Sequence, residues 1–238
     1  MATRPTTPRL RVTAASLLPP ELPASARGGE TRERILAAAA KVLIAGDGQC
    51  EIADVARAAG VSAGLSYHYF TSKAGLIAAV VEAFYDRLEA AVMDVNPKPG
   101  AGWGERERLR LERMVDFHYA EPLAPLILTR LSRTPDVAAV EAARLARHID
   151  LAAHNVELAQ QKGEIPADLD AHLLGAMILG GLRQAIGQAL GQETNRGKRP
   201  GRDRLTEQLW SFIAGTARLK PAQLKPIRLK PAAKKKGR

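Results

Sequence analysis

Residues 47–76 decide the fold, and they read Asp-Gly-Gln-Cys-Glu-Ile-Ala-Asp-Val-Ala-Arg-Ala-Ala-Gly-Val-Ser-Ala-Gly-Leu-Ser-Tyr-His-Tyr-Phe-Thr-Ser-Lys-Ala-Gly-Leu. Apolar residues at three- and four-residue spacing from Ile52 to Ala59 predict a short helix with one buried face. Gly60 is expected to end this helix, because glycine adopts the left-handed conformation at little cost. Ser62 is a natural N-cap for a second helix. Two short helices around a glycine turn are typical of a helix-turn-helix, whose second helix enters the DNA major groove.

The second helix is dense in small and polar residues. Ala63 and Gly64 have almost no side chain, which lets the backbone come close to another surface. We expect Leu65 and Phe70 to pack inward. The residues between them carry hydroxyls and an imidazole, which suit contacts to phosphates and base edges: Ser66, Tyr67, His68 and Tyr69.

A third helix is expected to follow directly. Thr71 or Ser72 would cap it, and Lys73 would lie in its first turn. A cation there is unfavourable for the helix dipole, so a phosphate contact would explain it, although an exposed lysine without a role remains an alternative.

These residues closely resemble the N-terminal domain of TetR-family transcriptional regulators. The similarity is carried by Val55–Ser62, Gly64, Tyr67–Phe70, Ser72-Lys73 and Leu76. The preceding segment fits as well, with Thr31 as the expected cap of a helix whose apolar stripe consists of Ile35, Leu36, Ala39, Val42 and Leu43. The resemblance covers residues 31–76, about a fifth of the chain. An αα-corner in a helical enzyme or scaffold is the alternative interpretation of the geometry alone.

The resemblance implies a recognition helix at Ser62–Tyr69. It places Ala63, Gly64 and Ser66 against bases or backbone, and Tyr67 and Tyr69 at phosphates or base edges, with His68 between them. Lys73 would contact a phosphate. The complete set of expected DNA-binding residues is Ser62, Ala63, Gly64, Ser66, Tyr67, His68, Tyr69 and Lys73.

Three positions depart from the family pattern. Cys50 and Glu51 stand where the family usually has a Thr or Ser that caps the helix and reaches a phosphate. Ala63 replaces a residue that is often polar, and Leu65 replaces a common Thr. Few long side chains remain for reading bases, so the resemblance says least about the operator sequence.

The rest of the chain is expected to be all-α. Aromatic residues make up 4% of its 238 residues, and no run alternates Val, Ile and Thr. We expect helices at 76–95, 105–120, 123–131, 135–162, 167–191 and 202–218, with a linker at 96–104. The expected architecture is a three-helix helix-turn-helix domain at 29–76 followed by a six-helix ligand-binding and dimerisation domain at 77–217. For the second domain the resemblance is architectural only.

The positive charge is concentrated at the two ends. The chain carries +10, and residues 1–29 hold four arginines and one glutamate, whereas residues 218–238 hold nine Lys or Arg and no acid. The remainder, residues 30–217, therefore carries about −2. Proline is frequent in both ends, as in Lys220-Pro221, Lys225-Pro226 and Lys230-Pro231, so we expect residues 1–28 and 218–238 to be disordered tails. They either attract DNA without sequence preference or keep the protein in solution.

Glycines within one apolar helix predict the dimer interface. Gly175, Gly180, Gly181 and Gly187 share the 167–191 segment, and each internal glycine costs about 1 kcal/mol relative to Ala. Close helix–helix approach would justify that cost, and the last two long helices are where the resemblance places a four-helix homodimer interface. The expected interface residues are Gly175, Gly180, Gly181, Leu205, Leu209 and Phe212. Close packing within one subunit is the alternative.

Polar residues on apolar helices suggest an effector pocket. We select Phe117, His118, Tyr119 and Arg130 as its lining, against the alternative that they lie on the surface or in the core. A metal site is not expected, because His148 and His154 are six residues apart and no HxxxH, HExxH or CxxC pair occurs. No cofactor is expected. The single cysteine, Cys50, is expected to be a half-buried thiol.

The sequence therefore predicts a cytoplasmic, DNA-binding homodimer. No apolar stretch is long enough for a membrane span, and no phosphate loop, GxSxG motif or carboxylate pair indicates an enzyme. The leading hypothesis is a repressor that binds a palindromic operator in double-stranded DNA and is released by a small-molecule effector. The alternative is an architectural or nucleoid-associated DNA-binding protein without an effector, which relies on its basic tails.

Overall fold

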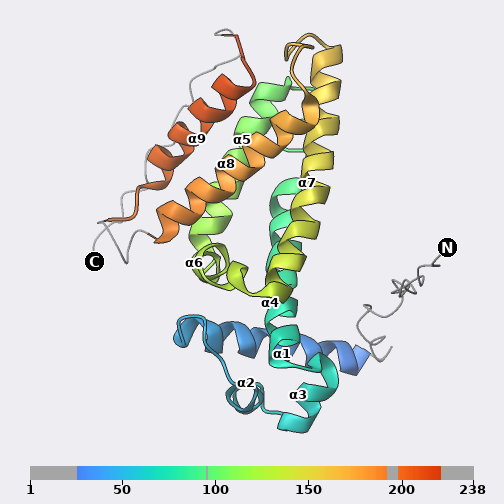
Figure 1. Ribbon diagram of the computed structural model, residues 1–238, viewed down its shortest axis with the longest axis vertical. Coiled ribbons are helices and arrows are strands. Elements are labelled where there is room, and N and C mark those ends of the chain that lie inside the picture. The colour runs from blue at the N-terminus through green and yellow to red at the C-terminus, as the bar shows by residue number, and fades with distance from the viewer. Residues whose placement is uncertain (1–25, 95, 192–197, 221–238) are drawn as a thin grey trace, which may run out of the picture.

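The computed structural model describes residues 26–94, 96–191 and 198–220, and the regular structure in these ranges is helical, without a strand (Figure 1). The α-helices are α1 Ala26–Ala45, α2 Ile52–Ala59, α3 Ala63–Phe70, α4 Lys73–Leu88, α5 Trp103–Ala120, α6 Ala124–Thr129, α7 Pro135–Gln161, α8 Ala171–Gly191 and α9 Arg202–Thr216. A π-helical turn, Glu89–Met93, follows α4, and a 3₁₀ turn, Leu131–Arg133, follows α6. The all-α prediction is confirmed.

Helices α1 to α3 form a small head at one end of the molecule (Figure 1). Its core consists of side chains that are almost fully buried, among them Ile35, Leu43 and Val55. Helix α1 begins at Ala26, so the prediction that Thr31 caps it was wrong. Gly28 and Gly29 have low helix propensity, so the sequence did not predict this first turn. The helix nevertheless includes both glycines.

Helix α4 connects the head to the larger helical body. Leu76 near its start is buried in the hydrophobic core, as is Phe84 further along, where the ring contacts Phe117 of α5. The predicted domain boundary after residue 76 therefore falls inside one helix. The single helix expected at 76–95 instead ends at Leu88 and widens into the π turn, where Asp94 donates its N–H to the carbonyl of Glu89.

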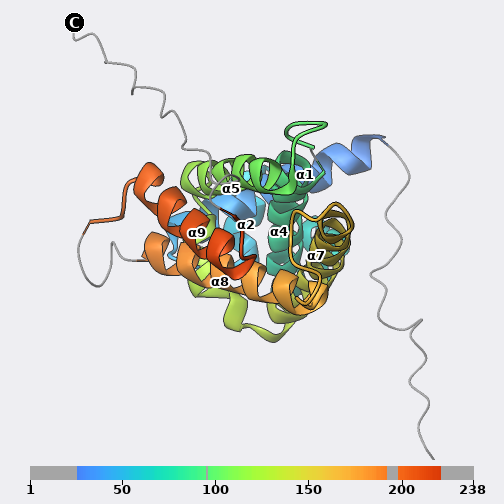
Figure 2. The ribbon, with the colours of Figure 1, turned by 90° about the horizontal axis from the view of Figure 1, so that it is seen from above.

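The body consists of α5 to α9 packed beside α4, with α7 along α4 and α9 on the outside (Figures 1 and 2). Helix α8 lies against α6, α7 and α9. By length and composition alone, α8 is the one helix in the described ranges that could cross a membrane. It is instead a packed element of the body, and its Arg183 is paired with Glu141 of α7.

The folded chain extends slightly beyond both predicted limits. Helix α1 includes residues 26–28, and Arg218 pairs with Asp168 at 2.8 Å while Leu219 is buried. The prediction of disorder was wrong for these residues, because side-chain contacts continue past the last helix. The rest of both predicted tails lies outside the described residues.

Candidate functional site

The turn between α2 and α3 has the geometry that the sequence predicts. Gly60 adopts φ 65°, in the left-handed region, and Val61 donates its N–H to the carbonyl of Ala56 at 3.0 Å. Ser62 caps α3, and its hydroxyl accepts a hydrogen bond from the N–H of Leu65 at 3.1 Å. These contacts fix the angle at which α3 leaves the turn.

Helix α3 presents one face to solvent and the other to the head core. Ser62, Ala63, Gly64, Tyr67 and His68 are exposed, with Tyr67 at 52%, and Tyr69 is half-buried. Two expected orientations were wrong. Leu65 is exposed rather than packed inward, whereas Ser66 is 1% exposed and its hydroxyl has no hydrogen-bond partner. The reason is helical spacing, because Ser66 shares the inward face with Phe70 four residues later.

Two cations beside α3 are each paired with a carboxylate. Lys73, at the start of α4, donates to Glu51 at 2.8 Å, and Arg57 of α2 pairs with Asp54 at 3.0 Å. The hydrogen bond to Glu51 raises the pKa of Lys73. Helix α3 itself contains no Lys or Arg. Lys73 and Arg57 are therefore both engaged, whereas the guanidinium of Arg32 in α1 lies over the ring of Phe70, 5.6 Å from its centroid.

Glu51 belongs to this site, although the sequence alone did not predict its contact with Lys73. It precedes α2 but makes no capping hydrogen bond with its side chain, which reaches Lys73 instead. The signal was the departure from the Thr or Ser expected at that position. Cys50 beside it is buried at 4% exposure, so the expectation of a half-buried thiol was wrong, and this burial raises the pKa of the thiol.

The fold and the exposed α3 define a helix-turn-helix DNA-binding protein. Residues 35–80 match the family model described as bacterial regulatory proteins, tetR family. This match identifies the N-terminal part of the chain as a TetR-type DNA-binding domain, the domain that bacterial transcription regulators of this family carry. No curated protein matches the sequence.

Several solved structures share this fold. GusR from Salmonella enterica is 24% identical with a TM-score of 0.63, and the match covers 79% of this chain and 96% of that one. The fatty acid degradation regulator FadR from Bacillus halodurans is 18% identical with a TM-score of 0.64, covering 80% and 97%. FadR from Bacillus subtilis, solved with stearoyl-CoA, is 19% identical with a TM-score of 0.65, covering 77% and 98%.

Two neighbouring cavities lie inside the body. The first has a volume of about 100 Å³ between α5, α7 and α8, and its lining includes Trp103, Arg110 and Asn155. The second has a volume of about 70 Å³, and its lining includes Tyr85, His118 and Arg183. Three apolar side chains line both cavities and separate them: Met114, Leu179 and Leu182.

Of the four expected pocket residues, the structure brings only His118 to these cavities. Phe117 packs against Phe84, and Tyr119 donates its hydroxyl to the carbonyl of Pro200 at 2.6 Å. Arg130 lies at the junction with the head, where it binds the carbonyl and the carboxylate of Asp47. These three residues therefore have contacts elsewhere, and Arg130 connects body to head.

The expected dimer residues lie in different environments within the subunit. Gly175, Leu205 and Leu209 are buried within the subunit, and a Cβ at Gly175 would lie 3.3 Å from Ala152 of α7. Gly181 lies under the ring of Phe212, where a Cβ would come within 2.7 Å of the ring. Gly180, in contrast, faces open space. Close packing within one chain explains most of these glycines, whereas the exposed apolar surface of α8 and α9 consists of Leu173, Met177 and Phe212.

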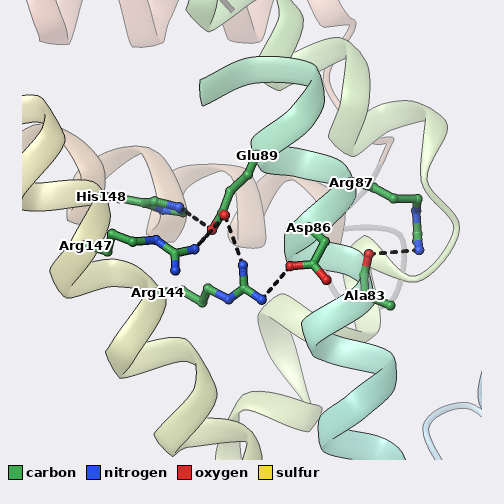
Figure 3. Close-up of polar contacts among 7 residues, drawn as sticks. All are labelled: Ala83, Asp86, Arg87, Glu89, Arg144, Arg147 and His148. Carbon is green, nitrogen blue, oxygen red and sulfur yellow. Dashed lines mark hydrogen bonds and ion pairs between the residues drawn. The ribbon is translucent and has the colours of Figure 1, made fainter. Parts of the chain in front are cut away.

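A cluster of charges joins α4 to α7, and sequence reasoning did not single it out (Figure 3). Glu89 accepts hydrogen bonds from Arg144 at 3.0 Å, Arg147 at 2.6 Å and His148 at 2.8 Å. Partial burial opposes ionisation of Glu89, but these donors outweigh it and lower its pKa to about 2. Residues 144, 147 and 148 share one helical face, and this spacing was the available signal.

Proposed function

We propose that the protein is a dimeric repressor that binds a palindromic operator and releases it when a small molecule enters the body. The observation that carries this proposal is an exposed recognition helix on a head joined by one continuous helix, α4, to a body with internal cavities. An effector that favours one arrangement of α4 and its neighbours would change the spacing of the two heads. Such coupling is typically worth ~1–3 kcal/mol and is reciprocal between operator and effector.

The operator contacts are assigned to the exposed face of α3. Ser62, Ala63, Gly64, Tyr67, His68 and half-buried Tyr69 remain candidates, and Lys73 is a candidate once it leaves Glu51. Ser66 is removed from the set because it is buried. Tyr67 is the largest exposed side chain of α3, so Tyr67→Ala is the first variant to test.

The dimer is proposed to form through the outer surfaces of α8 and α9. Leu173 and Met177 lie one helical turn apart on α8 and are more than half exposed, so together they form an apolar surface of the kind that a partner subunit covers. Open space at Gly180 leaves room for a second subunit. A two-fold dimer would place two recognition helices in successive major grooves, about 34–36 Å apart.

The experiment is selection of genomic DNA fragments by the purified full chain at ~0.15 M salt, where non-specific binding is weak. We expect one palindromic sequence, whose affinity falls in Tyr67→Ala without loss of the dimer in sedimentation. Met177→Glu should dissociate the dimer, with exposed Glu157→Gln on α7 as a control. Recovery of unrelated fragments would instead support the architectural alternative.

The effector is unidentified, and the stearoyl-CoA complex of the Bacillus subtilis FadR makes acyl-CoA one class to test. Operator binding measured with and without the compound gives the answer. A repressor requires that the bound effector weakens the complex with DNA, whereas a strengthened complex would indicate the opposite response.

A further inference from the structure

The charged groups that line the two body cavities cancel one another. In the first cavity Arg110 pairs with Glu107. In the second, Arg183 pairs with Glu141 at 2.5 Å, and His148 hydrogen-bonds to Glu89 at 2.8 Å. Within the described residues, neither cavity offers a cation without a carboxylate beside it.

Each cavity does offer one neutral polar group that is free to bind. The amide of Asn155 makes no hydrogen bond in the described part of the chain, and it can both donate and accept. His118 is buried, and its Nδ1 lies 2.7 Å from the carbonyl of Met114, so Nδ1 carries the donated proton. Burial lowers the pKa of His118 and keeps the ring neutral, which leaves Nε2 as an acceptor.

An anion in these cavities would be poorly compensated. It would lie near the carboxylates of Glu107 and Glu141, whose partner cations are already engaged. Removing an ion from water without a partner is costly, and competing for Arg183 would leave Glu141 unpaired in its turn. A neutral ligand avoids both costs.

The remaining lining is apolar and adaptable. Met114, Leu179 and Leu182 separate the cavities, and an unbranched methionine changes rotamer readily, so a modest rearrangement would join them. The exposed side chain of Leu151 lines the first cavity and marks its side toward solvent.

We propose that the joined cavities bind one uncharged, mainly apolar molecule that hydrogen-bonds to Asn155 in the first cavity or to Nε2 of His118 in the second. A primary or secondary alcohol has the required chemistry, since its hydroxyl can donate to the imidazole or bond to the amide. The inference rests on the proposed effector-controlled function, and it assigns the ligand class.

The test is titration of the full chain with three probes of equal length: 1-octanol, octanoate and octylammonium. Trp103 lines the first cavity, so its fluorescence reports binding once the only other tryptophan is removed by Trp210→Phe. We expect 1-octanol to bind at least 10-fold more tightly than either charged probe. Octanoate binding as tightly as octanol, or no response to any probe in fluorescence and thermal unfolding, would overturn the proposal.

Two variants test the hydrogen bonds. Of Asn155→Leu and His118→Leu, the variant that removes the partner of the octanol hydroxyl should weaken octanol binding by about 3- to 10-fold, the loss of one hydrogen bond. His154→Leu, at the exposed neighbouring position on α7, is the matched control and should bind as the parent does. If both cavity variants bind octanol as tightly as the control, the assignment of these two groups is wrong.

Operator binding with the same probes separates this inference from the proposed function. If octanoate binds in the cavities and releases the operator, the neutral-ligand inference fails while the effector-controlled repressor stands. If 1-octanol binds with the expected preference and operator affinity does not change, the ligand class stands and the proposed coupling fails.

Discussion

Two glutamates, one in the head and one in the body, show how burial determines the contribution of an ion pair to stability. Glu51 is 72% exposed and holds Lys73 at the surface, whereas Glu89 is 16% exposed and accepts from two arginines and a histidine. Exposed pairs contribute about 0–1 kcal/mol, but removing one partner of a buried group costs several times more. We therefore expect Glu89 to act on stability and Glu51 to act on DNA binding.

The largest effect is expected for Glu89→Gln. The amide cannot carry the charge that three donors compensate, so we expect the free energy of unfolding to fall by roughly 2–3 kcal/mol. Glu51→Gln is the matched control and should change it by less than about 0.5 kcal/mol. Urea unfolding of both variants measures the difference, and equal values would refute the contrast between the two sites.

The same contrast predicts a pH dependence. The pKa of Glu89 is lowered from 4.5 to about 2 in the folded state, so the unfolded chain binds this proton first as the pH falls. The stabilisation is complete above pH 4.5 and is lost as the pH falls toward 2. Across that window Glu89→Gln should lose less stability than the parent does, which thermal unfolding at several pH values can measure.

Glu51→Thr should strengthen DNA binding. The substitution frees Lys73 for a phosphate and removes a negative charge from the exposed face, so we expect up to about tenfold higher affinity and a salt dependence steeper by about one phosphate contact. Adding Lys73→Ala should cancel the gain. Unchanged affinity in Glu51→Thr at low salt would show that Lys73 does not reach DNA.

Ser66→Ala should stabilise the head by about 1 kcal/mol. The hydroxyl of Ser66 is buried without a partner, and Ala removes this cost while favouring the helix. Operator affinity should stay the same, because the side chain faces the core. A loss of operator affinity would return Ser66 to the recognition surface and contradict its burial.

The head was predictable from sequence because its signals are local. Gly60 and Ser62 determine the turn within a few residues, and both behave as expected. The two errors in α3, Leu65 and Ser66, arose because residue type was followed instead of helical spacing. The body cavities could not be predicted in this way, since they form between helices that are far apart in the sequence.

The glycines of α8 also show that the sequence does not determine which helices pack together. Their number correctly indicated close helix–helix approach, but the sequence does not say whether the neighbour belongs to the same chain. In the structure Gly175 faces Ala152, and Gly181 faces Phe212.

The Glu89 cluster was not predicted from the sequence, because Glu89 lies in the π turn after α4 and its donors lie more than 50 residues later in the chain.

The smallest effect on stability is expected at the contact that joins the two regions. Arg130 of the body binds the carbonyl and carboxylate of Asp47 in the turn between α1 and α2, and both side chains are largely exposed. Arg130→Gln and Asp47→Asn should each change the free energy of unfolding by less than about 0.5 kcal/mol.

If the contact between Arg130 and Asp47 holds the head at a fixed angle to the body, however, the same variants should alter operator affinity by a few fold. A double-mutant cycle on operator affinity separates these roles, because a coupling energy that is present for DNA binding and absent for unfolding requires the contact to orient the head. A cycle that is additive in both measurements would reduce the Arg130–Asp47 pair to a solvated surface contact.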